Sequence, residues 1–175
     1  TLHFKIEEFT PCNIFAEFSA ANKLSHATPN NSNTNKPPVI VMNGFSAAMH
    51  EMSRNEYKGK LNATVLKLVA TTFQNMYPPV DSKTFSLKTA SKRTILFKFN
   101  PENETITVRQ YMNQIEQVQQ QSSDEQGNTE TKNTQKIKLV GMGPRLTLSL
   151  YKIEEEVMGG DVLYHATVKK SAQEI

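Results

Sequence analysis

Two segments of the chain alternate apolar and polar residues in the way that half-buried β-strands do. Residues 146–150 read Leu-Thr-Leu-Ser-Leu, and residues 2–6 read Leu-His-Phe-Lys-Ile. A period of two places alternate side chains on one face, so both segments are predicted to be strands with one buried face. Acidic residues follow each segment, at 7–8 and at 154–156. The repeated pattern leaves two interpretations open, an internal duplication or the chance recurrence of a common strand pattern.

Two other segments have the three-and-four spacing of apolar residues that indicates an amphipathic helix. Thr10 as cap and Pro11 as first helical residue predict a short helix that runs to about Leu24. A longer helix is predicted over residues 61–76, ending before Pro78-Pro79. Its predicted core-facing residues are Leu61, Val65, Leu68, Val69, Phe73 and Met76.

The remaining elements are predicted from apolar runs, β-branched residues and turn signals. The uninterrupted Val-Ile-Val-Met at 39–42 is typical of a central strand covered on both faces. Residues 46–60 have an irregular or weakly helical pattern. The other predicted strands are 84–87, 94–99, 105–111, 136–140 and 162–168, with turns at 100–103, 141–144 and 159–161.

Two polar tracts interrupt these elements. Residues 26–36 and 117–134 are rich in Asn, Gln, Ser and Thr, and they bury too little apolar surface to offset the entropy lost on ordering. The first is interpreted as a linker and the second as a disordered insertion. The whole pattern predicts an α/β fold with a mixed, mostly antiparallel sheet and packed helices, with a boundary after residue 36.

Composition narrows the class of protein. The single cysteine, Cys12, excludes an internal disulfide and a cysteine-based zinc site within these 175 residues. No apolar run approaches the ~18 residues that span a bilayer, so we expect no membrane partner. The chain starts inside a strand pattern without an initiator Met, and we therefore expect it to be a piece of a longer protein.

No group of residues has the spacing of a catalytic or metal site. The four histidines, His3, His26, His50 and His165, are not paired at ligand spacing. The Gly-Met-Gly-Pro segment at 141–144 lacks the amide donors and the following helix of a phosphate loop. The three acids at 154–156 are interpreted as a solvated strand end. We expect no enzyme activity, no metal and no cofactor.

Positive charge is concentrated in one part of the chain. The net charge is +3, but between Lys83 and Tyr111 there are six basic residues and only two acidic ones. The basic residues are Lys83, Lys88, Lys92, Arg93, Lys98 and Arg109. They could neutralise several phosphates of an RNA backbone, or they could belong to an ordinary solvated loop and hairpin.

Several motifs resemble the Brix-domain proteins of ribosome assembly, and in particular the Ssf/Peter Pan subfamily. Phe-Gln-Asn-Met-Tyr-Pro-Pro at 73–79 is similar to the subfamily's Phe-Gln-Asn-x-Phe-Pro-Pro, and 86–93 resembles its Ser-Ile-Lys-Arg-like loop. Gly-Pro-Arg-Leu-Thr at 143–147 and Asn-Gly-Phe at 43–45 also match subfamily motifs. Gln110 stands where the family usually has His, and the insertion at 117–134 is shorter and less acidic than usual.

The resemblance implies two duplicated halves, each similar to an anticodon-binding domain, with the first half incomplete. Residues 1–36 would be the end of the first half plus the polar linker, although residues after Phe9 match poorly. Residues 37–175 would be the second half, with a disordered insertion at about 117–135. This arrangement agrees with the repeated strand pattern.

The resemblance also implies a function, that of a non-enzymatic assembly factor that binds precursor rRNA during maturation of the large (60S) ribosomal subunit in the nucleolus of the nucleus. The expected partners are the large-subunit rRNA precursor, ribosomal proteins, and other large-subunit assembly factors, one of them as a heterodimer. The expected RNA-binding residues are Lys83, Lys88, Lys92, Arg93, Lys98, Arg109 and Arg145. Two alternatives stay open: a protein–protein docking module that uses exposed sheet edges, and a Brix protein of the small-subunit pathway.

Overall fold

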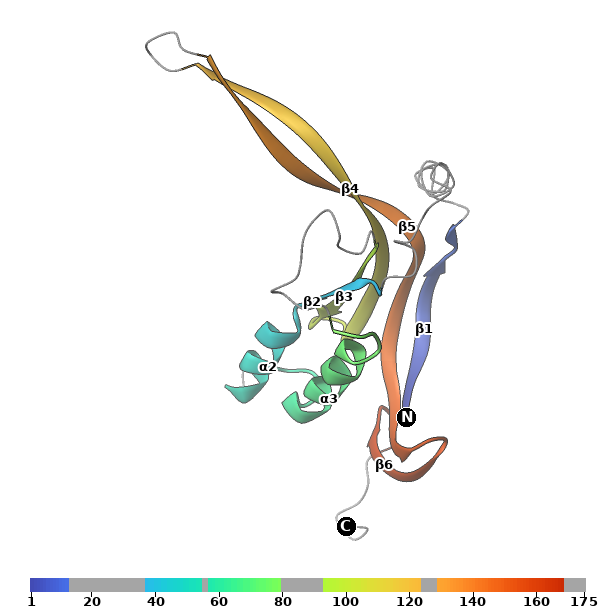
Figure 1. Cartoon of the computed structure of the whole chain (residues 1–175). Helices are drawn as coiled ribbons and strands as arrows, with labels where there is room; N and C mark the ends of the chain where they lie inside the picture. The colour runs from blue at the N-terminus through green and yellow to red at the C-terminus, as the bar shows by residue number, and fades with distance from the viewer. Residues whose placement is uncertain (13–36, 55–56, 80–92, 124–128, 169–175) are drawn as a thin grey trace.

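The described part of the chain forms a six-stranded sheet with two helices on one side (Figure 1). The computed structural model describes residues 1–12, 37–54, 57–79, 93–123 and 129–168. In chain order the elements are β1 (Leu2–Thr10), β2 (Val39–Asn43), α2 (Phe45–Ser53), α3 (Ala63–Gln74), β3 (Arg93–Asn100), β4 (Thr105–Ser123), β5 (Thr129–Glu156) and β6 (Gly159–His165). Among the described strands, β2 and β3 form the only parallel pair. The predicted α/β class with a mixed, mostly antiparallel sheet is confirmed.

The two segments with the repeated alternating pattern are neighbours in this sheet. β1 pairs antiparallel with β5, with Phe4 opposite Leu150 and Ile6 opposite Leu148. Phe4 also stacks on Phe73 of α3, with ring centroids 5.6 Å apart. Both segments are strands, as predicted. Leu150 is in the core and Leu2 and Phe4 pack against it, but Ile6 is 60% exposed, so the predicted buried face of β1 is buried only in part.

The strand at 39–42 forms, but the prediction that it is central is wrong. The strand order is β1-β5-β4-β3-β2, so β2 lies at the end of the sheet, and Val41 is 42% exposed. Ile40 and Met42 pack against the core. An uninterrupted apolar run therefore does not require a second covered face, because the helices bury only alternate residues of this short strand.

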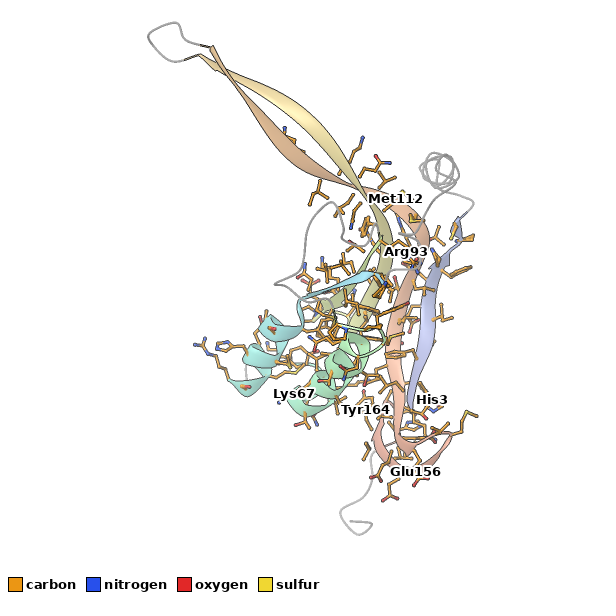
Figure 2. All side chains as sticks on the ribbon, in the orientation of Figure 1. His3, Lys67, Arg93, Met112, Glu156 and Tyr164 are labelled. Carbon is orange, nitrogen blue, oxygen red and sulfur yellow. The ribbon has the colours of Figure 1, made fainter. Side chains whose placement is uncertain are left out.

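The core lies between the two helices and the sheet, where Figure 2 shows side chains gathered from both layers. The largest fully buried side chains include Phe99 of β3 and Leu66 and Val69 of α3. Phe73 stacks on Phe97 of β3, with ring centroids 4.4 Å apart. Aromatic contacts of this kind fix how α3 lies across the strands.

The longer helix is shorter than predicted, and part of its predicted buried face is wrong. It spans Ala63–Gln74, and the Asn62 side chain caps it by accepting a hydrogen bond from the Val65 N–H at 2.8 Å. Leu68 and Met76 are 40% and 57% exposed. The buried face includes Leu66 and Ala70 instead. These residues flank Val65 and Val69 on one side of the helix and Leu68 flanks them on the other, and the sheet contacts the side of Leu66.

Residues 46–60 were expected to be irregular or weakly helical, and the first part of this segment belongs to α2 (Phe45–Ser53). Gly44 stands at the N-cap with φ 81°, a conformation that favours glycine. Phe45 and Ala48 are buried. Tertiary packing of these two residues stabilises a helix that the local sequence pattern only weakly favours.

The predicted hairpin of β3 and β4 is confirmed, and its turn is tied to the loop before α3. The Glu104 carboxylate accepts hydrogen bonds from the Tyr57 hydroxyl at 2.9 Å and from the backbone N–H groups of Lys60 and Leu61. Burial and, after it, the hydrogen bond to Glu104 raise the pKa of Tyr57 well above its usual range. The turn and the loop are thus held together by one side chain.

The prediction of disorder at 117–134 is wrong for the residues on both sides of 124–128. β4 continues to Ser123 and β5 begins at Thr129, with Val118 opposite Thr134 and Ser123 opposite Thr129. The two strands form a long ribbon that projects from the body of the sheet (Figure 1). A polar composition is compatible with this ribbon because no proline interrupts residues 105–140. Backbone pairing also continues in one register from the Tyr111–Gly141 pair, which lies at the body of the sheet, into the ribbon.

The Gly143-Pro144 segment is not the turn that was predicted. It lies inside β5, where the peptide bond between the two residues is cis and Gly143 has φ 65°. Arg109 pairs with Arg145 and Tyr111 pairs with Gly141, so three residues of β5 lie opposite Gln110 alone. This irregularity is a bulge, which bends the strand without ending it.

The last hairpin forms, but its turn is earlier than predicted. Glu156 of β5 pairs with Gly159 of β6, so the turn residues are Val157 and Met158. Tyr164 of β6 packs against the main core.

Several predictions concern residues outside the described ones. These are residues 13–24 of the first predicted helix, the linker at 26–36, the strand at 84–87, and residues 124–128. The division into residues 1–36 and 37–175 stays a prediction.

Candidate nucleic-acid interface

We call the side of the sheet that faces away from α2 and α3 the open face. Phe97, Phe99 and Ile106 point toward the helices and are buried, so alternation places their neighbours along β3 and β4 on the opposite side. The cross-strand register extends this side over β5 and β1. Its central residues are Leu96, Lys98, Thr107, Arg109, Arg145, Thr147, Thr10 and Glu8.

Two arginines lie directly opposite each other at the centre of the open face. Arg109 of β4 pairs with Arg145 of β5, and both side chains are exposed. Side chains at directly opposed positions have Cβ atoms about 4.5 to 5.5 Å apart, and like charges at such positions destabilise a sheet. An anion bound between the two guanidinium groups could accept hydrogen bonds from both.

Lys98 adds a third positive charge beside this pair. It lies on β3 opposite Thr107, and is therefore diagonal to Arg109, at a separation of about 7 to 8 Å. Among the described residues, neither Lys98 nor Arg109 has an ion pair or a side-chain hydrogen bond. Three strands thus contribute one cation each to a single surface.

The structure places the other predicted RNA-binding residues elsewhere. Arg93 is the first residue of β3 and is exposed, but alternation along the strand puts it on the side of Ile95 and the helices. It was predicted to lie in the loop together with Lys88 and Lys92. Lys83, Lys88 and Lys92 are outside the described residues.

Acidic residues of β1 bound the basic surface on one side. The Ser149 hydroxyl donates a hydrogen bond to Glu7 at 2.6 Å, and the Thr147 hydroxyl donates one to Glu8 at 3.2 Å. The bond from Ser149 and then the one from Lys5 hold the pKa of Glu7 below its usual value. Glu7 is therefore ionised at neutral pH, and an RNA backbone would be repelled from this edge.

Two lysines at the base of the ribbon were missed by the sequence reasoning. Lys136 and Lys138 of β5 are exposed, and alternation places them on the same side of the strand as Val140. Val140 pairs with Met112, and Met112 pairs with Arg93, so the two lysines lie on the same side of the sheet as Arg93. The alternating Lys-Ile-Lys at 136–138 was the available signal. This pattern was interpreted only as a strand that leads into the next one at 146–150, because the ribbon was not expected.

The described residues show no arrangement that suggests catalysis. No group of three His, Cys, Asp or Glu residues in this part of the chain is placed to hold a metal ion. Neither of the helices that the structure describes is long and apolar enough to cross a membrane. The geometry does bring three basic side chains together from three strands, at the centre of the open face.

Comparison with known proteins identifies the family. The Brix domain model matches residues 1–152. The chain belongs to the Brix-domain family. This result confirms the resemblance inferred from the motifs at 43–45, 73–79 and 143–147, two of which form the start of α2 and the bulge of β5.

The relatives include Peter Pan and SSF proteins, as predicted. Protein Peter pan of Drosophila melanogaster is 28% identical over 99% of this chain and 44% of its own length. The Suppressor of SWI4 1 homolog of Mus musculus is 24% identical over 100% of this chain and 43% of its own length. The Ribosome biogenesis protein SSF1 of Saccharomyces cerevisiae is 59% identical over 22% of this chain and 9% of its own length. The chain spans less than half of the fly and mouse relatives.

Proposed function

We propose that this Brix-domain chain acts as a non-enzymatic ribosome assembly factor that binds precursor rRNA through the open face. The observation that carries the proposal is the Arg109–Arg145 pair with Lys98 diagonal to it. Phosphate groups fit this pattern, because a guanidinium donates two parallel hydrogen bonds to phosphate oxygens. Contacts of this type give affinity without base specificity.

The subunit on which the protein acts is proposed with support from the relatives and from the subfamily resemblance. The yeast relative is named a ribosome biogenesis protein, and the Ssf/Peter Pan resemblance favours the large subunit. We propose that the protein acts in the nucleolus on the large-subunit precursor, together with ribosomal proteins and other assembly factors, one of them in a heterodimer.

Replacing both Arg109 and Arg145 by threonine is expected to weaken binding to all RNA sequences alike, by about tenfold or more. The slope of log affinity against log salt concentration should become shallower by about 1.5, because two phosphate contacts are lost. Fluorescence anisotropy with a labelled rRNA fragment at several salt concentrations measures the affinity and the slope, and urea unfolding in parallel checks that the variant is folded.

A matched control removes two positive charges elsewhere. Lys58 and Lys67 are exposed and lie outside the open face, so Lys58→Gln with Lys67→Gln should leave the salt slope nearly unchanged. If the control variant lost as much affinity as the arginine variant, net charge and not the open face would determine binding. Unchanged affinity and slope in the arginine variant would refute the proposed site.

A second function is favoured by the free outer edge of β2. No strand among the described residues pairs with that edge, and an extended peptide of a partner protein could add to it. Binding of that kind depends little on salt. A steep salt dependence that disappears in the arginine variant therefore distinguishes RNA binding from strand addition.

Depleting the protein in cells is expected to lower mature large-subunit rRNA and to leave small-subunit rRNA nearly normal. This outcome follows from the proposed action on the large-subunit precursor. Quantitative hybridisation of both mature rRNAs over the course of depletion measures it. An earlier fall in small-subunit rRNA would assign the chain to the small-subunit pathway.

A further inference from the structure

The turn between β5 and β6 exposes two large apolar side chains. Val157 is 89% exposed and Met158 is 81% exposed, the two highest values among the exposed large hydrophobic residues of the described chain. Tight turns between antiparallel strands usually contain Gly, Asn or Asp. Apolar side chains at this place gain nothing from the fold of the chain itself, which indicates that something outside the described chain covers them.

The turn is held in a fixed conformation. Met158 has φ 58°, which is unfavourable for a side chain of its size. The Thr1 hydroxyl accepts a hydrogen bond from the Met158 N–H at 3.1 Å and donates one to the Glu156 carbonyl at 2.6 Å. The turn is therefore tied to Thr1, the residue before β1, and its two apolar side chains are presented with little conformational freedom left to lose on binding.

The charge around the turn is negative. Glu155, Glu156 and Asp161 are exposed, whereas the nearby Lys152 is paired with Glu154. An RNA backbone would be repelled here, while a protein surface rich in Lys and Arg would be attracted. The turn is thus an apolar anchor surrounded by carboxylates, and this combination fits a basic protein surface with an apolar pocket.

The turn is also far from the basic centre of the open face. Arg145 and Glu156 are on the same strand, eleven positions apart, which corresponds to roughly 35 Å along a strand. Figure 2 places Glu156 at the end of the sheet opposite to Arg93 and Met112. Both surfaces can therefore be occupied at the same time.

We propose that Val157 and Met158, surrounded by Glu155, Glu156 and Asp161, form a docking tip for a basic protein. The apolar pair enters a pocket on that protein, and the carboxylates contact Lys and Arg side chains around the pocket. This interaction does not depend on RNA binding by the open face.

Site-specific photo-crosslinking tests the docking tip. The photoreactive amino acid p-benzoylphenylalanine replaces Val157 in the full-length protein, which is expressed in its own cells, and the adduct is identified by mass spectrometry. The expected product is an adduct with a Lys- and Arg-rich segment of a protein. An RNA adduct, an adduct with an acidic segment, or no adduct would each overturn the proposal. The same probe in place of Met76, a residue that is 57% exposed after α3, is the control and should not give that adduct.

Two variants test which part of the tip binds, using a synthetic peptide of the crosslinked segment as the probe. Met158→Gly should lower its affinity by about tenfold or more, because a buried side chain is removed. The unfolding midpoint should not fall, because glycine accepts a positive φ. Glu155→Lys with Glu156→Lys should lower the affinity at low salt by about tenfold, with less effect at high salt. Unchanged affinity in both variants would show that the tip is not the docking surface.

Discussion

Replacing Leu66 by alanine is expected to lower the free energy of unfolding by roughly 2 to 5 kcal/mol. Leu66 is 1% exposed and belongs to the core shared by the helices and the sheet. The substitution removes buried apolar surface and leaves a cavity that close-packed neighbours fill only in part. Such a loss is a large fraction of the total stability of a domain of this size.

Urea unfolding followed by circular dichroism measures this loss, and Leu68→Ala is the matched control. Leu68 is on the same helix but is 40% exposed, so its replacement should lower the stability by less than about 1 kcal/mol. Equal losses in the two variants would mean that the buried face of α3 is assigned wrongly. Loss in Leu68→Ala alone would restore the face predicted from the sequence.

This pair of residues shows what periodicity can and cannot predict. Four apolar residues, Val65, Leu66, Leu68 and Val69, occur within five positions, and a spacing of three or four can be drawn through either Leu66 or Leu68. The helix itself was therefore predictable. Its exact rotation depends on which strands it covers, and Phe97 and Phe4, which stack on Phe73, come from distant parts of the chain.

The ribbon of β4 and β5 shows the limit of composition. Gln, Asn, Ser and Thr bury little surface, and on that basis residues 117–134 were expected to be disordered. The strands extend because each is the continuation of a strand anchored in the sheet, and above the bulge one register continues from the Tyr111–Gly141 pair to the Ser123–Thr129 pair. The composition of a segment indicates how little apolar surface it can bury, but it does not show that the segment continues a strand of a stable sheet.

The arginine pair could not be found from the sequence because it depends on register. Arg109 and Arg145 are 36 positions apart. Tyr111 pairs with Gly141, and if the strands continued from there without a bulge, Gly143 would lie opposite Arg109. The bulge places two more residues on β5 than on β4 and so brings Arg145 to this position, on the same side of the sheet. The Gly-Pro-Arg motif that marked the family thus sets the geometry of the candidate site.

The open face and the docking tip together describe a molecule with two surfaces of opposite charge on one long strand. β5 carries Arg145 at its bulge and Glu155 and Glu156 at its end. A basic surface that binds phosphates and an acidic tip that binds a basic protein would orient the chain between an RNA and a protein. Reversing the charge on one surface should therefore leave binding at the other intact.

Replacing Gly44 by alanine is expected to lower the free energy of unfolding by roughly 2 to 5 kcal/mol, from backbone strain and overpacking together. Gly44 has φ 81°, and a Cβ atom there would lie 2.3 Å from the carbonyl oxygen of Phe99. That oxygen is part of the β3 backbone and cannot move without disturbing the sheet. Asn-Gly-Phe is one of the motifs that mark the family, and this contact gives a physical reason for its glycine.

Gly159→Ala is the matched control for this prediction, measured by the same urea unfolding. A Cβ atom at Gly159 would have nothing within 4 Å, and its φ is not positive, so the stability should change by less than about 1 kcal/mol. Because Phe45 next to Gly44 is 3% exposed, any shift of the α2 start would also expose core surface. A Gly44→Ala variant as stable as the Gly159→Ala variant would mean that β3 and α2 are not packed as closely as the 2.3 Å approach requires.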